Sequence, residues 1–223
     1  MSTMLNMNIR QKQVYAKRAF LTSPFRKKKY ERRGHMQIRL ASPLQTDSIV
    51  DGEGIRTVLW TQGCSHHCKG CHNPGTHAFD GGFSIDTEEL KQEIAKLRGQ
   101  DGITLSGGDP FFQINSVLEI ATYCQEIGLN VWAYTGFTFE QLQERAIKNP
   151  NLLKLLQKID VLVDGKFEIE QKSLNLYFRG SRNQRIIDVP KSLKYNKVIE
   201  IRKYKQDKKE EKQQYGKMEF VYI

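Results

Sequence analysis

The chain has little of what membrane proteins and secreted proteins contain. No apolar run approaches the roughly 20 residues that a membrane helix needs, and only four of the 223 residues are cysteine. Three of these thiols lie within eight residues, and an odd cluster of this kind fits a disulfide framework poorly. The sequence also shows no secretory signal. We therefore expect a cytoplasmic protein that does not associate with a membrane.

Acidic residues are nearly missing from the start of the chain. Residues 1–36 contain ten Lys or Arg and a single acid, Glu31, so they carry +9 of the total net charge of +10. The basic character therefore belongs to an extension and says little about what the rest of the chain binds. We expect residues 1–35 to be a disordered arm, or the product of an early start codon with Met36 as the alternative start. A nucleic-acid tether, an address signal and an organelle transit peptide are the alternatives.

Strand and helix patterns alternate through the remainder, residues 36–223. Apolar runs at residues 57–61, 103–105, 130–134 and 160–163 predict buried strands, and helical spacing predicts helices over residues 86–97, 115–127, 139–147 and 152–159. This alternation predicts a parallel sheet with helices outside. The patterned region is too short for a complete barrel, which needs roughly 200 residues or more. We predict an α/β fold, a partial, open (βα)6-type TIM-like barrel, with a charged tail from about residue 191.

A few residues have a purely structural interpretation. Asp86 or Thr87 is expected to cap the first helix, and Gly128 to end the second. Cys124 lies on the apolar side of that second helix, so we expect a buried thiol and no role as a metal ligand. In the tail, residues 198–204 and 218–223 are predicted to form strands.

The most informative feature is the spacing C-x3-C-x2-C at Cys64, Cys68 and Cys71. Close cysteine spacing lets a single loop wrap an iron–sulfur cluster. Three cysteines would leave one iron of a [4Fe-4S] cube without a protein ligand, and that iron would be free to bind a small molecule. Zinc is the alternative, because four nearby histidines are candidates for the fourth ligand of a Cys3His site. These are His66, His67, His72 and His77.

Several motifs around the cysteines resemble those of the radical S-adenosylmethionine (SAM) superfamily. The sequence Asp-Gly-Glu-Gly-Ile-Arg at residues 51–56 precedes the cysteines, His-Asn-Pro at 72–74 follows them, and Ser-Gly-Gly-Asp-Pro lies at 106–110. Together they resemble the enzymes that install glycyl radicals. Gly70, residues 163–168 and residues 178–185 resemble the group that acts on anaerobic ribonucleoside-triphosphate reductase. The resemblance runs from about residue 49 to 189. Glu53 departs from it, because the family usually has proline there.

The resemblance implies two cofactors, a [4Fe-4S] cluster on the three cysteines and SAM chelated to the open iron. It implies that residues 106–110 hold the methionine moiety, with Asp109 accepting a hydrogen bond from its amino group. Asp109 followed by proline is equally a good start for a helix. The other residues that we expect to contact SAM are Gly70, His72, Gly107, Gly108 and Tyr134.

The resemblance also implies the reaction and the partners. A flavodoxin or ferredoxin would reduce the cluster, and SAM cleavage would yield a radical that removes a glycine hydrogen from the large subunit of the reductase. We expect no nucleic-acid partner. Lys166, Arg179, Arg182 and Arg185 are candidates for partner contacts, with an ordinary solvated turn as the alternative. Activation of pyruvate formate-lyase or another glycyl radical enzyme is a rival function, and a zinc-stabilised nucleic-acid-binding protein is a rival of another class.

Overall fold

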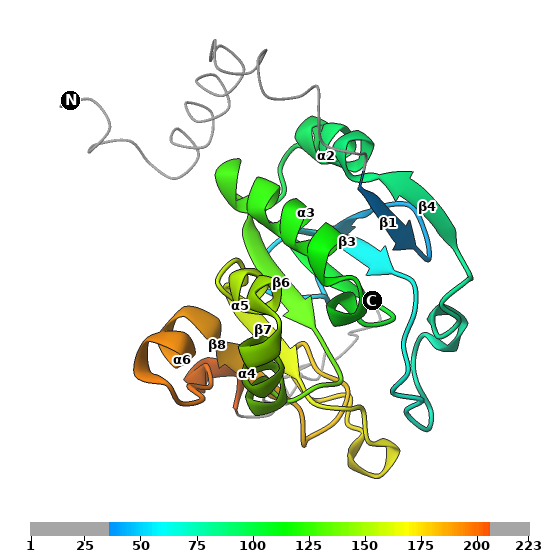
Figure 1. Cartoon of the computed structure of the whole chain (residues 1–223). Coiled ribbons are helices and arrows are strands. Elements are labelled where there is room, and N and C mark those ends of the chain that lie inside the picture. Colours follow the sequence, from blue (N-terminus) through cyan, green and yellow to red (C-terminus); the bar gives the residue numbers. More distant parts are fainter. Residues whose placement is uncertain (1–35, 206–223) are drawn as a thin grey trace, which may run out of the picture.

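The computed structural model describes residues 36–205 (Figure 1). The basic extension and the predicted strand at 218–223 lie outside these residues. Within the described part, no helix is long and apolar enough to cross a membrane. The fold is a mixed α/β fold built on a single open sheet of eight strands.

Four parallel strands form the centre of this sheet, and antiparallel strands flank them. The order is β4-β1-β3-β5-β6-β7-β8, with β2 paired to β3. β3, β5, β6 and β7 run parallel, whereas β1, β4 and β8 pair antiparallel with their neighbours. The strands are β1 Gln37–Leu40, β2 Gln45–Ser48, β3 Arg56–Thr61, β4 Phe83–Asp86, β5 Gly102–Gly107, β6 Asn130–Tyr134, β7 Val161–Asp164 and β8 Arg185–Asp188.

Several helices begin or end at residues that provide caps. The side chain of Asp86 accepts a hydrogen bond from the amide of Glu88 at the start of the first helix, as predicted. Thr138 and Gln141 form a capping box. Gly128, at φ +82°, follows the second helix in the left-handed region that glycine favours. The helices are α2 Thr87–Lys96, α3 Ile114–Glu126, α4 Phe139–Lys148, α5 Pro150–Leu156 and α6 Val189–Tyr195.

Alternate residues of the strands pack into two different apolar clusters. On β6, Val131 and Ala133 belong to the large core that also contains residues of α2, α3, α4 and α5. Trp132 lies on the other face and packs with Tyr204 and neighbouring apolar residues. This follows from the two-residue period of a strand. Cys124 is fully buried in the large core, as predicted, and burial raises the pKa of its thiol far above the usual range.

The strand predicted over residues 198–204 is wrong. Helix α6 precedes this region, and the region itself contributes only an isolated bridge between Ile187 and Glu200 before a short 3-10 helix, Arg202–Tyr204. The reason is that Tyr204 fills a space beside Trp132, with the ring centroids 6.0 Å apart. Aromatic packing at one end of the segment therefore replaces continuous strand pairing.

Candidate functional site

The carboxyl ends of the four parallel strands bring most of the predicted site residues to one edge of the sheet. β3 leads into the cysteine loop, β5 ends at Gly107, β6 ends at Tyr134 and β7 ends at Asp164. Ligand sites of α/β folds form at this edge because the loops there converge. The linear order of the motifs in the sequence thus becomes a spatial cluster.

The cysteine loop, residues 62–73, is attached to the end of β5 through backbone contacts. The amide of Asp109 donates to the carbonyl of Gly63 over 3.0 Å, and the amide of Gly108 donates to Thr61 over 2.7 Å. A Cβ atom at Gly108 would collide with the carbonyl of Gly63. Glycine at 108 is therefore required for the close approach of the two segments.

The three cysteines lie on this one loop with different exposure. Cys64 is buried, with 8% of its surface exposed, whereas Cys68 and Cys71 are partly exposed. Burial raises the pKa of the Cys64 thiol to about 11, and nearby Asp109, Cys68 and Cys71 act in the same direction. Within residues 36–205, no group of three or more His, Cys, Asp or Glu side chains is arranged to hold a single metal ion.

Asp109 is the polar centre of this edge. One carboxylate oxygen accepts from the amide of Phe111 over 2.9 Å, so the predicted role at a helix start is confirmed for a short 3-10 helix, Pro110–Phe112. The other oxygen accepts from His66, from the hydroxyl of Thr135 and from the amide of Gly136, over 2.7, 2.8 and 3.0 Å. Asp109 is 1% exposed, and both oxygens of its carboxylate accept hydrogen bonds from groups of the protein.

A cleft of about 320 Å³ contains two of the predicted SAM contacts, His72 and Tyr134. The ring of His72 lies 4.7 Å from that of Phe167. The hydroxyl of Tyr134 donates to the carbonyl of Phe178 over 2.8 Å, and burial raises its pKa well above the usual range. Gly70, at φ +72°, packs so closely that a Cβ atom would lie 2.9 Å from Ile169. These contacts join the cysteine loop to the loop that follows β7.

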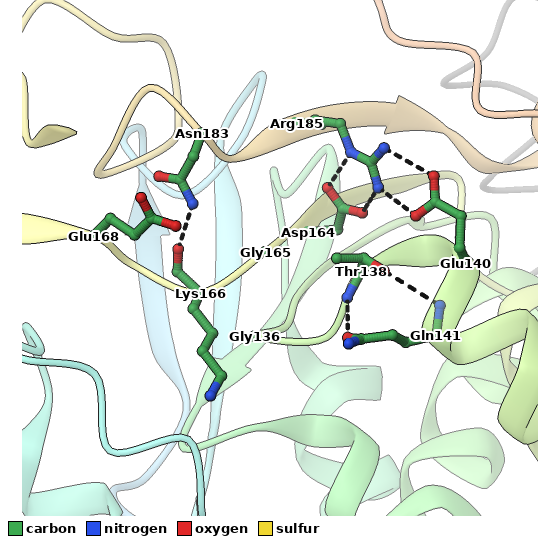
Figure 2. A pocket seen from close by; sticks show the side chains of 10 residues that line it. All are labelled: Gly136, Thr138, Glu140, Gln141, Asp164, Gly165, Lys166, Glu168, Asn183 and Arg185. Carbon is green, nitrogen blue, oxygen red and sulfur yellow. Dashed lines mark hydrogen bonds and ion pairs between the residues drawn. The ribbon is translucent and has the colours of Figure 1, made fainter.

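A second cavity, of about 420 Å³, lies beside the ends of β6 and β7 (Figure 2). Arg185 crosses it. Its guanidinium donates to Asp164 over 3.0 and 2.5 Å and to Glu140 over 2.9 and 2.7 Å. These hydrogen bonds lower the pKa of Glu140 to about 2 and raise that of Arg185. The exposed side chain of Lys166 points away from this group of charges.

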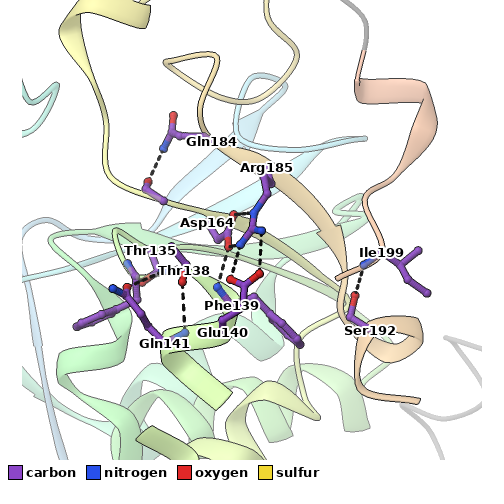
Figure 3. A network of polar contacts seen from close by, with 12 residues as sticks. Thr135, Thr138, Phe139, Glu140, Gln141, Asp164, Gln184, Arg185, Ser192 and Ile199 are labelled. Carbon is purple, nitrogen blue, oxygen red and sulfur yellow. Dashed lines mark hydrogen bonds and ion pairs between the residues drawn. The ribbon is translucent and has the colours of Figure 1, made fainter. Parts of the chain in front are cut away.

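The remaining predicted partner contacts lie on the loop before β8. Arg182 is exposed, whereas Arg179 donates to the carbonyl of Gln184 over 3.2 Å. Gln184 holds the loop closed, because its side-chain oxygen accepts from the amides of Gly180 and Ser181. The three predicted arginines therefore have different surroundings. Arg179 bonds within its own loop and Arg182 is exposed to solvent, whereas Arg185 belongs to the ion-pair network at the second cavity (Figure 3).

Sequence reasoning missed several residues that build this edge. His66 appeared only as a possible zinc ligand, Thr135 only beside Tyr134 as a candidate SAM contact, and Gln184 only within the motif at residues 178–185. Glu140 did not appear as a site residue. Their roles depend on partners that are distant in the sequence; His66 and Asp109, for example, are 43 positions apart. The position of His66 between two cysteines was a usable signal. The motifs around Tyr134 and at residues 178–185 were signals for Thr135 and Gln184. For Glu140, the sequence offered none.

Comparison with known proteins identifies the family. The family described as "4Fe-4S single cluster domain" matches residues 50–187. The anaerobic ribonucleoside-triphosphate reductase-activating protein of Haemophilus influenzae is 37% identical over 147 residues, which are 61% of this chain and 89% of that protein. The chain belongs to the family of anaerobic ribonucleoside-triphosphate reductase-activating proteins. The Vibrio cholerae member is 38% identical over 61% of this chain and 89% of its own length, and the phage T4 member is 35% identical over 62% and 86%.

Among solved structures, QueE from Escherichia coli covers 47% of this chain and 55% of its own, at 17% identity and a TM-score of 0.40. A likeness at this level adds nothing to the assignment. The family description does decide between the two metals that the sequence left open, because it names a 4Fe-4S cluster. The resemblance inferred from the motifs is thereby confirmed.

In this member of the activating-protein family, the departure at Glu53 has a local explanation. Its carboxylate pairs with Lys203 over 2.6 Å, and its carbonyl accepts from Arg56 over 3.1 Å. Lys203 lies beyond the residues that the family description matches. The acid thus connects the loop before β3 to a C-terminal segment of this chain.

Proposed function

We propose that this chain is a radical SAM enzyme that generates the glycyl radical of an anaerobic ribonucleoside-triphosphate reductase. One observation carries the proposal: a loop with three cysteines is fastened to the glycine-rich end of β5, in a chain that belongs to the activating-protein family. The reaction needs a cluster and a SAM site side by side. The residues that we assign to the cluster and to SAM lie at the same edge of the sheet.

The three thiols fit an iron–sulfur cluster. They are soft ligands on a single loop, and thiolates of this kind hold iron–sulfur clusters. Cys64, Cys68 and Cys71 would hold three of the irons and leave the fourth for SAM. When bound, the reduced cluster and SAM supply the electron transfer and bond cleavage that remove a hydrogen atom from a glycine of the partner.

The chain's own residues orient the substrate and exclude water. We assign SAM contacts to the backbone of Gly107 and Gly108, since their amides and carbonyls lie beside the cysteine loop, and to Gly70, His72 and Tyr134 around the first cleft. Asp109 is held by four donors, so we assign it to fixing these strand ends. Its hydrogen bond to the amino group of SAM, which the resemblance implies, stays a prediction. Holding two reacting groups in one geometry contributes much of the rate of such a step.

The proposal also concerns how the site reaches its protein partner. We infer that the open sheet curves as a partial (βα)6-type barrel within an activase domain of residues 36–223, with one side open to a peptide loop of the reductase. Lys166, Arg179 and Arg182 would contact that partner, whereas Arg185 would contribute through its ion pairs. A flavodoxin or ferredoxin in the cytoplasm would supply the electron.

Electron paramagnetic resonance (EPR) tests the proposal. Anaerobic reconstitution should give a brown protein with four irons and four acid-labile sulfides per chain, and reduced protein with SAM should place a doublet on the reductase. Cys68→Ala should abolish the doublet. Cys124→Ala, the matched control for a thiol outside the loop, should retain it. A colourless protein with one zinc would refute the proposal, and a doublet on pyruvate formate-lyase instead would reassign the partner.

A further inference from the structure

One buried side chain, His66, links the cysteine loop to the sheet. Its Nε2 atom lies 2.7 Å from Oδ2 of Asp109, and the imidazole donates because an ionised carboxylate only accepts. The side chain of His66 is 8% exposed and that of Asp109 is 1% exposed. A charge-assisted hydrogen bond in such surroundings is among the strong ones, and low local polarity strengthens it further.

The ring of His66 is also enclosed on its sides. It lies 4.5 Å from the ring of Phe137 and 5.7 Å from that of Phe112. A Cβ atom at Gly136 would come within 2.7 Å of the imidazole Cγ atom. The ring fits here only because residue 136 is glycine. The surrounding side chains hold the imidazole against the ends of both β5 and β6.

The other end of the same residue reaches the cysteines. His66 follows Cys64 by two residues, and Cys64, with 8% of its surface exposed, is the most buried of the three cysteines in the loop. Solvent exposure of the cluster and hydrogen bonds to its sulfurs are among the means by which a protein sets the reduction potential. His66 thus stands between the first metal ligand and the strand ends at which SAM is expected.

We propose that His66 is a positioning residue of this site. Held by Asp109, its side chain fixes the cysteine loop against the ends of β5 and β6, and in doing so it fixes the position of Cys64, two residues earlier. His66 acts through these two neighbours rather than on the reacting atoms. This inference rests on the proposed function, since it concerns the cluster and SAM.

Three variants of the reconstituted holoprotein test it. His66→Ala removes the donor, whereas His66→Gln keeps a nitrogen donor near the position of Nε2. His67→Asn is the matched control: the neighbouring ring packs 5.4 Å from His77 rather than against Asp109, and asparagine tolerates the positive φ of 49° at that residue. The measurements are the midpoint potential of the cluster, from EPR titration, and the dissociation constant for SAM.

We expect His66→Ala to bind SAM about tenfold more weakly or worse, the effect of losing one hydrogen bond to a charged group, and to shift the midpoint potential. His66→Gln should recover most of both, and His67→Asn should match the wild type within about twofold. Unchanged potential and affinity in His66→Ala would overturn the inference. Equal losses in His66→Gln and His66→Ala would overturn it too, because the donor to Asp109 would then be irrelevant.

Hydrogen exchange in the cluster-free chain separates this inference from the proposed function. Amides of residues 63–72 should exchange faster in His66→Ala than in the wild type or in His67→Asn. A wild type that forms no cluster would refute the proposed function, and the exchange rates would still decide whether His66 fastens the loop. Equal exchange rates in the three chains would contradict the inference that His66 holds the cysteine loop against the sheet.

Discussion

The ion pair between Arg185 and Asp164 yields a prediction about stability. Arg185→Met removes the cation from the carboxylate of Asp164, which is 1% exposed. Among residues 36–205, the amide of Phe139, at 2.7 Å, is then its remaining donor. Breaking a buried ion pair costs about 3–5 kcal/mol. Because the side chain of Arg185 is 28% exposed, we expect the lower end, about 3 kcal/mol of the free energy of unfolding.

Glu140→Gln is the matched control, because it removes the other carboxylate of the same guanidinium. The side chain of Glu140 is 57% exposed, so solvent screens its attraction to Arg185. We expect a loss of less than about 1 kcal/mol. Asp164→Asn in the Arg185→Met background should recover much of the lost stability, because the uncompensated charge is removed. Urea denaturation of the cluster-free chain under anaerobic conditions measures all four proteins.

The pH dependence provides a further check on the same network. The pKa of Glu140 falls from 4.5 to about 2 on folding, because Arg185 donates to its carboxylate. A carboxylate with a depressed pKa stabilises the fold above its unfolded pKa, and this contribution disappears as the pH falls toward the folded pKa. The difference between wild type and Glu140→Gln should therefore shrink from pH 4.5 downward. A loss below about 1 kcal/mol for Arg185→Met, or an equal loss for Glu140→Gln, would refute the reasoning.

Three other predictions follow from single contacts. In the cluster-free chain at pH 8, Cys64 should be alkylated far more slowly than Cys68, because it is buried and its pKa is about 11; equal rates in peptide mapping would contradict this. Tyr134→Phe should cost about 1–2 kcal/mol in urea denaturation, because the carbonyl of Phe178 loses its donor; an unchanged midpoint would show that this contact contributes nothing. Asp86→Ala should cost about 1 kcal/mol by the same assay through the lost helix cap, and Asp86→Asn, which keeps an acceptor, should cost less.

The sequence predicted the central βα units because their periodicity is strong. β3, β5, β6 and β7 and helices α2, α3 and α4 lie within a few residues of the expected ranges. The flanking strands were missed for physical reasons. β1 and β4 are four residues each and pair with one another, so their stability comes from a partner distant in the sequence. β8 follows a loop that looks polar and turn-like, and only its pairing with β7 makes it a strand.

The candidate site was predictable in its location but not in its hydrogen bonding. The order of motifs placed Cys64 and Asp109 at adjacent strand ends, which the backbone bond between Gly63 and Asp109 confirms. The sequence could not show that the carboxylate of Asp109 is already occupied by protein donors. That depends on Thr135 and Gly136, which follow β6 and meet Asp109 only after the sheet has formed.

The polar groups at this edge mostly bind one another, and this has a consequence for the reaction. His66 bonds to Asp109, Asp109 accepts from Gly136, the carbonyl of Phe137 accepts from Gly165, and the carbonyl of Gly165 accepts from Gln184. This chain of contacts joins the cysteine loop to the ends of β5, β6 and β7 and to the loop before β8. Because these contacts are made within the chain itself, we expect little of the binding energy of SAM to be spent on ordering the site. We would then expect the specific contacts to SAM to come from the backbone of Gly107 and Gly108 and from the walls of the first cleft.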